Sequence, residues 1–395
     1  MSLTGWGHHD DRAASTTHRS YLANLCGVRV SSPPTEGTAT VRSRRTRKPV
    51  IAVTGAASGV GEALARALAT RSDVGKVIAI DERRGDVPGV TWRVLDVRDP
   101  VLVSRLGKVD TVVHLAFDPG LEGDAATRSE RNLRGAQTVL TAAAATGVRR
   151  VVLVTSAMVY GALPENAVPL DEDAPLRALP DGALLSDLLE IEQLAQQAPR
   201  SHRGLSVTVL RPATVVGPDI DSLLTRHFEA PRLLVVRDSR PHWQFCHVDD
   251  LVSALELAAL EQVTGNVTVA CEGWMEQSEV ELVSGMRRIE LPSALAFGTA
   301  ERLHRLGIIP APASDLQYVV HPWVVPATRL RQAGWRPTYD NPTALGVLLE
   351  QVAGHHALAS RRVGKRDATI GAAGAAVAVV GTAALVRRAR RKRRS

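Results

Sequence analysis

A buried strand that runs through a glycine-rich turn into a helix is the feature that most limits how this chain can fold. Residues 50–53 (Val-Ile-Ala-Val) are continuously apolar and mostly β-branched, as expected for a strand buried on both faces of a parallel sheet. After the turn, Val60, Leu64 and Leu68 recur every four residues, which predicts an amphipathic helix. The segment therefore predicts the first strand–helix unit of an α/β fold.

Similar strands alternate with helices along the next 150 residues. The expected strands are Lys76–Ile80, Thr91–Leu95, Thr111–Leu115, Arg150–Thr155 and Ser206–Leu210, and two of the helices are Asn132–Ala145 and Leu184–Gln197. Such alternation implies right-handed crossovers and a doubly wound parallel sheet of the Rossmann type. Beyond residue 212 the alternation becomes irregular. Insertions at about 213–245 and 271–330 predict a smaller C-terminal region on the substrate side of the cleft.

Charge divides the chain into a body and two basic ends. Residues 361–395 carry eleven Lys or Arg and one acid, and residues 1–50 carry eight and three, so the net charge of +7 leaves the body mildly acidic. We expect residues 1–47 to be a disordered basic extension, 48–353 the folded domain, 354–368 a linker, and 369–395 an apolar segment with a polybasic tail. Nucleic acid is therefore disfavoured as a partner of the fold itself.

Composition excludes several classes of protein. The three cysteines, Cys26, Cys246 and Cys271, stand far apart without metal-ligand spacing, so we expect neither a disulfide scaffold nor a metal site, and a reducing, cytoplasmic compartment fits. Aromatic residues make up only 4% of the chain, which argues against a nucleic-acid reader that stacks bases on rings.

The glycine-rich turn predicts a dinucleotide site. It comprises Gly55, Ala57, Ser58, Gly59, Val60 and Gly61. Glycines allow a tight turn and close approach of a pyrophosphate, and the following helix offers free N–H groups and the positive end of its dipole. Asp81 ends the second strand, where it can accept hydrogen bonds from both ribose hydroxyls of NAD and repel the 2′-phosphate of NADP. Arg83 and Arg84 follow it and moderate the preference for NAD.

Further motifs resemble one family, the extended short-chain dehydrogenases/reductases, which include NAD-dependent epimerases and dehydratases. The matching segments span about residues 49–353 and are Leu95-Asp96-Val97, His114-Leu115-Ala116, Asn132-Leu133-Arg134-Gly135, Thr155-Ser156-Ala157-Met158-Val159-Tyr160-Gly161, Arg211-Pro212, His247-Val248-Asp249-Asp250-Leu251 and Gly334-Trp335-Arg336-Pro337. The resemblance implies that Asp96, Val97, Leu115, Ala116, Thr155 and Pro212 also contact the cofactor. The glycine spacing G-x-x-x-G-x-G departs from the G-x-x-G-x-x-G usual in the extended branch.

The catalytic pair of that family is missing. Its chemistry needs a Tyr and, four residues later, a Lys that lowers the tyrosine pKa. Aligning Glu192 with the family's usual glutamate puts Leu184 at the tyrosine position and Leu188 at the lysine position. Neither can move a proton, and no Tyr-x-x-x-Lys occurs anywhere in the sequence.

Four other residues are candidates for a catalytic role. Ser156 matches the family's substrate-orienting hydroxyl, although it could simply cap the strand end. Asp187 and Glu190 lie near the empty position, and His114 follows the fourth strand. The structural alternative for Asp187 and Glu190 is a solvated helix face, and the alternative for His114 is a histidine packed inside the fold. Two further residues have structural interpretations only: Tyr160 packs the turn, and Asp249 is the N-cap of a helix over 250–260.

Three functions remain open. The first is an NAD-binding protein with a degenerate site that acts as a nucleotide-responsive module. The second is an active oxidoreductase or epimerase with a non-standard acid or base. The third is a scaffold at a membrane or on nucleic acid, working through its basic tail.

The implied partner is a small molecule such as a sugar nucleotide, and a homodimer is also compatible with the sequence. A basic set in the C-terminal region would suit a phosphorylated ligand or form a solvated loop: Arg226, His227, Arg232, Arg237, Arg240 and His242. The uncharged run 369–386 and the arginines up to 394 predict association with the cytoplasmic face of a membrane.

Overall fold

The computed structural model describes residues 47–119, 124–180, 184–306 and 312–353, together with the strand pair at 357–358 and 361–362. The chain divides into two units, Met1–Thr46 and Arg47–Ser395, and every described residue belongs to the second. The predicted basic extension, apart from Arg47, and the predicted tail at 369–395 therefore lie outside the described residues. Within the segment predicted as a linker, Ala357–Leu358 (β14) pairs antiparallel with Arg361–Arg362 (β15).

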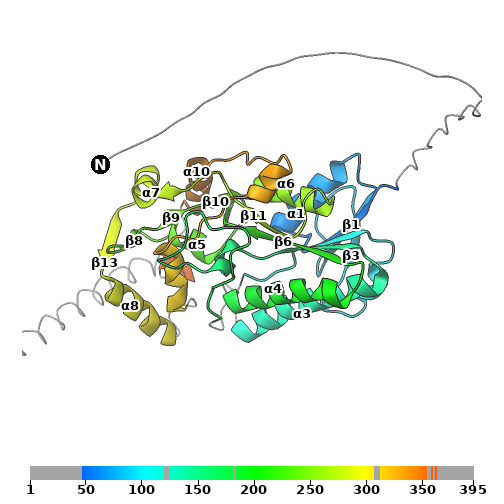
Figure 1. Ribbon diagram of the computed structural model, residues 1–395, viewed down its shortest axis with the longest axis horizontal. Coiled ribbons are helices and arrows are strands. Elements are labelled where there is room, and N and C mark those ends of the chain that lie inside the picture. Colours follow the sequence, from blue (N-terminus) through cyan, green and yellow to red (C-terminus); the bar gives the residue numbers. More distant parts are fainter. Residues whose placement is uncertain are drawn as a thin grey trace, which may run out of the picture. The chain divides into compact units, whose positions relative to one another are not determined.

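A seven-stranded sheet in the order β11-β6-β5-β4-β1-β2-β3 forms the centre of the fold (Figure 1). All of its neighbouring strands are parallel. The strands are β1 Val50–Thr54, β2 Lys76–Asp81, β3 Thr91–Val94, β4 Thr111–His114, β5 Arg150–Val154, β6 Ser206–Pro212 and β11 Asn266–Val269. The strand order reverses between β1 and β4, which is where ligands bind in doubly wound sheets. The predicted α/β fold of the Rossmann type is confirmed.

Helices cover both faces of the sheet, and alternate residues of each strand pack against the helices on opposite faces. Ile51 and Val53 of β1 pack in one apolar cluster with Leu64 of α1, whereas Ala52 packs in a second cluster. Figure 1 shows α1 and α6 above the sheet and α3 and α4 below it. The helices are α1 Gly59–Thr70 and α6 Val248–Ala259 on the first side, and α2 Leu102–Arg105, α3 Ala125–Thr146 and α4 Leu184–Ser201 on the second. Two buried faces explain why the strands are continuously apolar.

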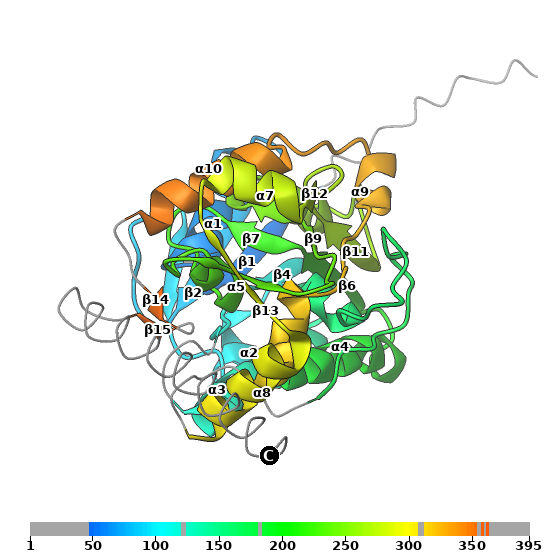
Figure 2. The same ribbon diagram turned by 90° about the vertical axis from the view of Figure 1, so that its left-hand side faces the viewer.

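The C-terminal region forms a smaller body at one end of the sheet, with β13 and α8 in front of the main strands in Figure 2. Its two-stranded pairs are β7–β10, β9–β12 and β8–β13. Its elements are β7 Thr214–Val216, α5 Leu223–His227, β8 Leu233–Val236, β9 His242–Trp243, β10 Phe245–His247, β12 Met275–Glu276, α7 Gln277–Ser284, β13 Arg288–Leu291, α8 Ser293–Arg305, η2 Ala313–Val319, α9 Thr328–Gln332 and α10 Asn341–Val352. A short 3₁₀ helix, η1 Ala157–Tyr160, follows β5.

One local prediction is wrong. The N-cap of α6 is His247 and not Asp249, because the helix already begins at Val248 and the His247 Nδ1 atom accepts a hydrogen bond from the Asp249 amide at 3.2 Å. The buried Asp250 carboxylate instead accepts hydrogen bonds from the amides of Thr338 and Tyr339. Asp250 thereby attaches the segment before α10 to α6.

Candidate functional site

The turn between β1 and α1 is shaped by two glycines. A Cβ on Gly61 would lie 2.0 Å from the carbonyl oxygen of Gly55, and a Cβ on Gly55 would lie 2.6 Å from the Leu115 carbonyl. Gly55 also adopts a φ of +68°, in the left-handed region that favours glycine. Ser58 is the N-cap of α1, but its side chain makes no capping hydrogen bond. The first turn of α1 thus presents backbone N–H groups, the arrangement that binds the pyrophosphate of a dinucleotide.

Asp81 lies beside this turn at the end of β2. Its Oδ2 atom accepts a hydrogen bond from the Ala57 amide at 3.0 Å, and Oδ1 accepts one from the Arg83 amide at 3.3 Å. The Arg83 guanidinium donates to the Ala57 carbonyl at 3.4 Å. The carboxylate is therefore fixed beside the turn, with a cation close by.

The remaining predicted cofactor contacts lie around the same edge of the sheet. The amides of Leu115 and Ala116 donate to Thr54 Oγ1, which fixes the end of β4 against β1. Asp96 forms a 2.6 Å ion pair with Arg98, which lowers the pKa of its carboxyl group. Val97 is buried beside Gly135, where an added Cβ would lie 3.3 Å from Val97 Cγ2. These residues fit one side of a dinucleotide site. The Asp96 carboxylate is already paired with Arg98 there.

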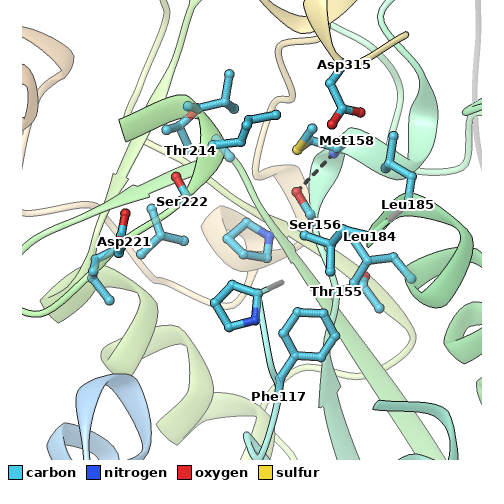
Figure 3. Close-up of a pocket in the computed structure, with 18 of the residues that line it drawn as sticks. Phe117, Thr155, Ser156, Met158, Leu184, Leu185, Thr214, Asp221, Ser222 and Asp315 are labelled. Atoms are coloured by element: carbon cyan, nitrogen blue, oxygen red, sulfur yellow. Dashed lines mark hydrogen bonds between the residues drawn. The ribbon is translucent and has the colours of Figure 1, made fainter. Parts of the chain in front are cut away.

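A pocket of about 250 Å³ opens beyond the carboxyl ends of β4, β5 and β6. Thr155 and Ser156 follow β5, Pro212 ends β6, and Phe117 follows β4. Figure 3 shows Met158, Leu184 and Leu185 on one side of this pocket and Thr214, Asp221 and Ser222 on the other. Leu184 and Leu188, at the positions where the sequence comparison expects the Tyr and Lys, both line it.

A family model supports the resemblance read from the sequence. The model of the NAD dependent epimerase/dehydratase family matches residues 51–270. The chain belongs to this family.

Three individual proteins illustrate the match. An uncharacterized protein of Mycobacterium tuberculosis (strain ATCC 25618 / H37Rv) is 29% identical over 311 residues, which cover 75% of this chain and 82% of that protein. The crystal structure of the Bordetella bronchiseptica enzyme WbmH in complex with NAD⁺ is 20% identical, covers 78% of this chain and 98% of that one, and gives a TM-score of 0.59. A Thermotoga maritima UDP-glucose 4-epimerase with UDP-glucose is 18% identical, covers 77% and 98%, and gives 0.57. At these identities the solved structures show the shared fold alone.

In this epimerase/dehydratase-family protein, the structure separates the four catalytic candidates. Ser156 lines the pocket, and its Oγ atom accepts a hydrogen bond from the Met158 amide at 3.1 Å. Asp187 is 2% exposed and pairs with Arg128 at 3.0 Å and with Asn132 Nδ2 at 3.0 Å. Glu190 is exposed. Of the four, only Ser156 is among the described residues that line the pocket.

His114 lies inside the fold. Its Nδ1 atom shares a 2.8 Å hydrogen bond with Thr54 Oγ1, and burial lowers its pKa to about 4. The imidazole is therefore neutral at physiological pH and holds β4 against β1. This is the packed histidine that the sequence offered as the structural alternative.

A buried polar network beneath the pocket escaped the sequence analysis. Arg211 on β6, 2% exposed, forms a two-pronged ion pair with Glu192 on α4 at 2.8 and 2.7 Å. It also donates to the Tyr160 hydroxyl at 2.9 Å, while Thr155 Oγ1 donates to Glu192 at 2.7 Å. The sequence did carry a signal for this network, namely an arginine inside an apolar strand, because a buried charge requires a partner. The network anchors Thr155, directly before Ser156.

The basic residues predicted as a phosphate site are engaged elsewhere or absent from the described lining of the pocket. Arg226 is 3% exposed and pairs with Asp221 at 2.9 Å, and Arg237 pairs with Glu290 at 3.1 Å. His242 lies 3.2 Å from Glu276. None of the six predicted residues is among the described residues that line the pocket.

The described part of the chain contains neither a metal-binding cluster nor a membrane-spanning helix. No group of three or more His, Cys, Asp or Glu side chains is arranged there to hold a metal ion. No helix in the described ranges is long and apolar enough to cross a membrane. The predicted membrane segment at 369–394 lies outside these ranges.

Proposed function

We propose that this family member binds NAD and a small molecule side by side but lacks the proton relay of its family, so that it works as an NAD-dependent ligand-binding module. The observation that carries the proposal is the lining of the pocket, where Leu184 and Leu188 stand beside Ser156. Alkyl side chains neither hold nor transfer a proton. Losing a positioned acid or base typically slows such chemistry by about 10²–10⁴-fold.

The cofactor side rests on this chain's own residues. The backbone at residues 55–61 receives the pyrophosphate, and Asp81 accepts hydrogen bonds from the adenosine ribose and disfavours the 2′-phosphate of NADP. When bound, NAD supplies a hydride acceptor. Leu184 and Leu188 exclude water from the neighbouring pocket, and Ser156 supplies a hydroxyl group there.

The alternative is an active enzyme with a non-standard acid or base, and the three titratable candidates that the sequence offers are poorly placed. The Asp187 carboxylate is occupied by Arg128 and Asn132, and His114 is neutral and packed between strands. Glu190 is an exposed residue of α4 and is not among the described residues that line the pocket. These contacts favour the first function.

A measurement of enzymatic turnover distinguishes the ligand-binding module from the active enzyme. The full-length protein is mixed with NAD and with UDP-glucose or dTDP-glucose, sugar nucleotides of the kind named for its relatives. We expect NAD to bind in calorimetry while no epimerised, dehydrated or oxidised sugar accumulates; a UDP-glucose 4-epimerase serves as the positive control. Product formation near an ordinary enzyme rate of about 10 per second would refute the proposal. Single substitutions at Asp187, Glu190 and His114, and at Asp221 and Asp315 of the pocket wall, would then locate the acid or base.

A further inference from the structure

The pocket beside Ser156 is apolar over most of its surface. Its lining includes Phe117, Met158, Leu188, Val215, Leu223 and Trp323. These side chains come from the segments after β4 and β5, from α4, from the start of the C-terminal region and from the segment after η2. Figure 3 shows Phe117, Met158 and Leu184 around one shared space. Apolar walls of this kind bind ligands by removing apolar surface from water.

The charges in the wall disfavour an anion. Arg128 is the one cationic side chain among the described lining residues, and its Nε atom already donates to the buried Asp187 carboxylate at 3.0 Å. Two carboxylates, Asp221 and Asp315, also line the pocket. Asp221 is itself paired with Arg226 at 2.9 Å, so a phosphate would lose its hydration beside a cation and a carboxylate that already have partners.

Three short segments that adjoin the pocket lining in the chain contain no cation. The segments 120–123, 181–183 and 307–311 adjoin the lining residues Pro119, Leu184 and Pro312 in the chain, and none of them contains Lys, Arg or His. In the described C-terminal region, Arg226 and Arg237 are paired with acidic residues. These segments and these two paired arginines thus give no support for a diphosphate.

One polar group in the wall is set up to donate. Ser156 Oγ accepts from the Met158 amide, and within the described residues no acceptor receives its hydroxyl proton. That O–H can donate to a carbonyl or hydroxyl oxygen of a ligand. One such hydrogen bond orients a ligand that is otherwise held by apolar contacts.

We propose that the pocket binds an uncharged, largely apolar molecule with one carbonyl or hydroxyl oxygen directed at Ser156, and not a sugar nucleotide. The inference rests on the proposed function, because it takes this pocket as the ligand site beside NAD. It names the class of ligand that the module holds.

A matched pair of probes tests the proposal on the NAD-loaded, full-length protein. 1-Naphthol and 1-naphthyl phosphate share one ring system and differ in the charged group, and UDP-glucose is the third ligand. We expect 1-naphthol to bind at least about tenfold more tightly than either anion in calorimetry, a difference of about 1.4 kcal/mol. Equal or tighter binding of 1-naphthyl phosphate or UDP-glucose would overturn the proposal.

A pair of variants shows that binding occurs in this pocket. Leu184→Lys places a charge in the wall at a half-buried position, and Leu282→Lys makes the same change on α7, where the leucine is 83% exposed. We expect the first to weaken 1-naphthol at least about tenfold and the second to leave it unchanged, because burying a charge against an apolar ligand is unfavourable. Equal affinities for the two variants would contradict the proposal.

The class of ligand can be judged separately from the behaviour of the variants and from the proposed function. The comparison of 1-naphthol with the two anions uses the unmodified protein, so its result remains valid even if Leu184→Lys fails to bind NAD. Turnover of a sugar nucleotide would refute the proposed function, whereas the affinities of the probes judge the class of ligand directly.

Discussion

The Asp187 carboxylate accepts a hydrogen bond from Arg128 Nε at 3.0 Å, inside the contact between α3 and α4. Asp187 stands one helical turn after Leu184, so this acidic group close to the missing tyrosine position in the chain is used to join two helices. The side chains of Arg128 and Asp187 are 9% and 3% exposed. A carboxylate fixed in this way supports the helix that carries Leu184 and Leu188.

Removing that carboxylate is expected to destabilise the fold. Asp187→Ala removes the carboxylate that faces the buried Arg128 guanidinium, and breaking a buried pair on one side typically costs about 3–5 kcal/mol. The free energy of unfolding in urea measures the loss. Glu190→Ala, on the exposed side of the same helix, is the control and should stay within about 0.5 kcal/mol. Similar values for the two variants would show that the pair contributes little.

Asp81 is expected to set the preference for the cofactor. Asp81→Ala removes the acceptor for the ribose hydroxyls and the repulsion of a 2′-phosphate, so NAD should lose more affinity than NADP. Calorimetric titration of both cofactors measures this, with Glu82→Ala, an exposed neighbour, as the control. Unmodified protein that binds NADP as tightly as NAD would refute the assignment of Asp81.

His114 is expected to make stability depend on pH. Burial lowers its pKa to about 4 from an ordinary value of 6.5. As pH falls from 6.5 towards 4, the unfolded chain therefore takes up a proton that the folded protein does not. The contribution is complete above pH 6.5 and is lost on acidification. His227, whose pKa burial also lowers to about 4, acts in the same direction.

The variant His114→Gln isolates this effect. It should reduce the drop in unfolding free energy between pH 7, which lies above the window of about 4 to 6.5, and pH 4.5, which lies inside it. His202→Gln, at an exposed histidine, is the control and should keep the full drop. An unchanged drop in His114→Gln would show that the histidine does not couple folding to pH.

We also propose that residues 369–394 bring the protein to a membrane. The run 369–386 contains no charge, and as a helix it would be about 27 Å long. Arginines after it would meet anionic headgroups. Full-length protein should enter the membrane pellet, and a version ending at Arg366 should not. Full-length protein in the soluble fraction at low salt, or released by nuclease, would contradict this.

The strands of the sheet were predictable because their signals are local. A continuous apolar run such as residues 50–53 marks a strand buried on both faces, and the glycines at 55 and 61 mark the turn that follows. The positions of Leu184 and Leu188 came from matching one helix to a family pattern, and the structure places both in the pocket wall.

Contacts between distant segments were not predictable in the same way. The pairing of Arg211 with Glu192 joins a strand to a helix, and that of Arg128 with Asp187 joins two helices. No local pattern encodes which of many charged residues will meet. The N-cap of α6 was misplaced because His247, with a ring nitrogen as acceptor, replaced the aspartate usually expected at that position.

A crystal structure of the full-length protein with NAD bound tests the central claim most directly. We predict that Leu184, Leu188 and Ser156 lie around the nicotinamide ring. We also predict that no Asp, Glu, His, Tyr or Lys side chain lies within about 3.2 Å of the atoms that would exchange a proton with a ligand there. A titratable side chain at that distance, from any part of the chain, would contradict the loss of the proton relay.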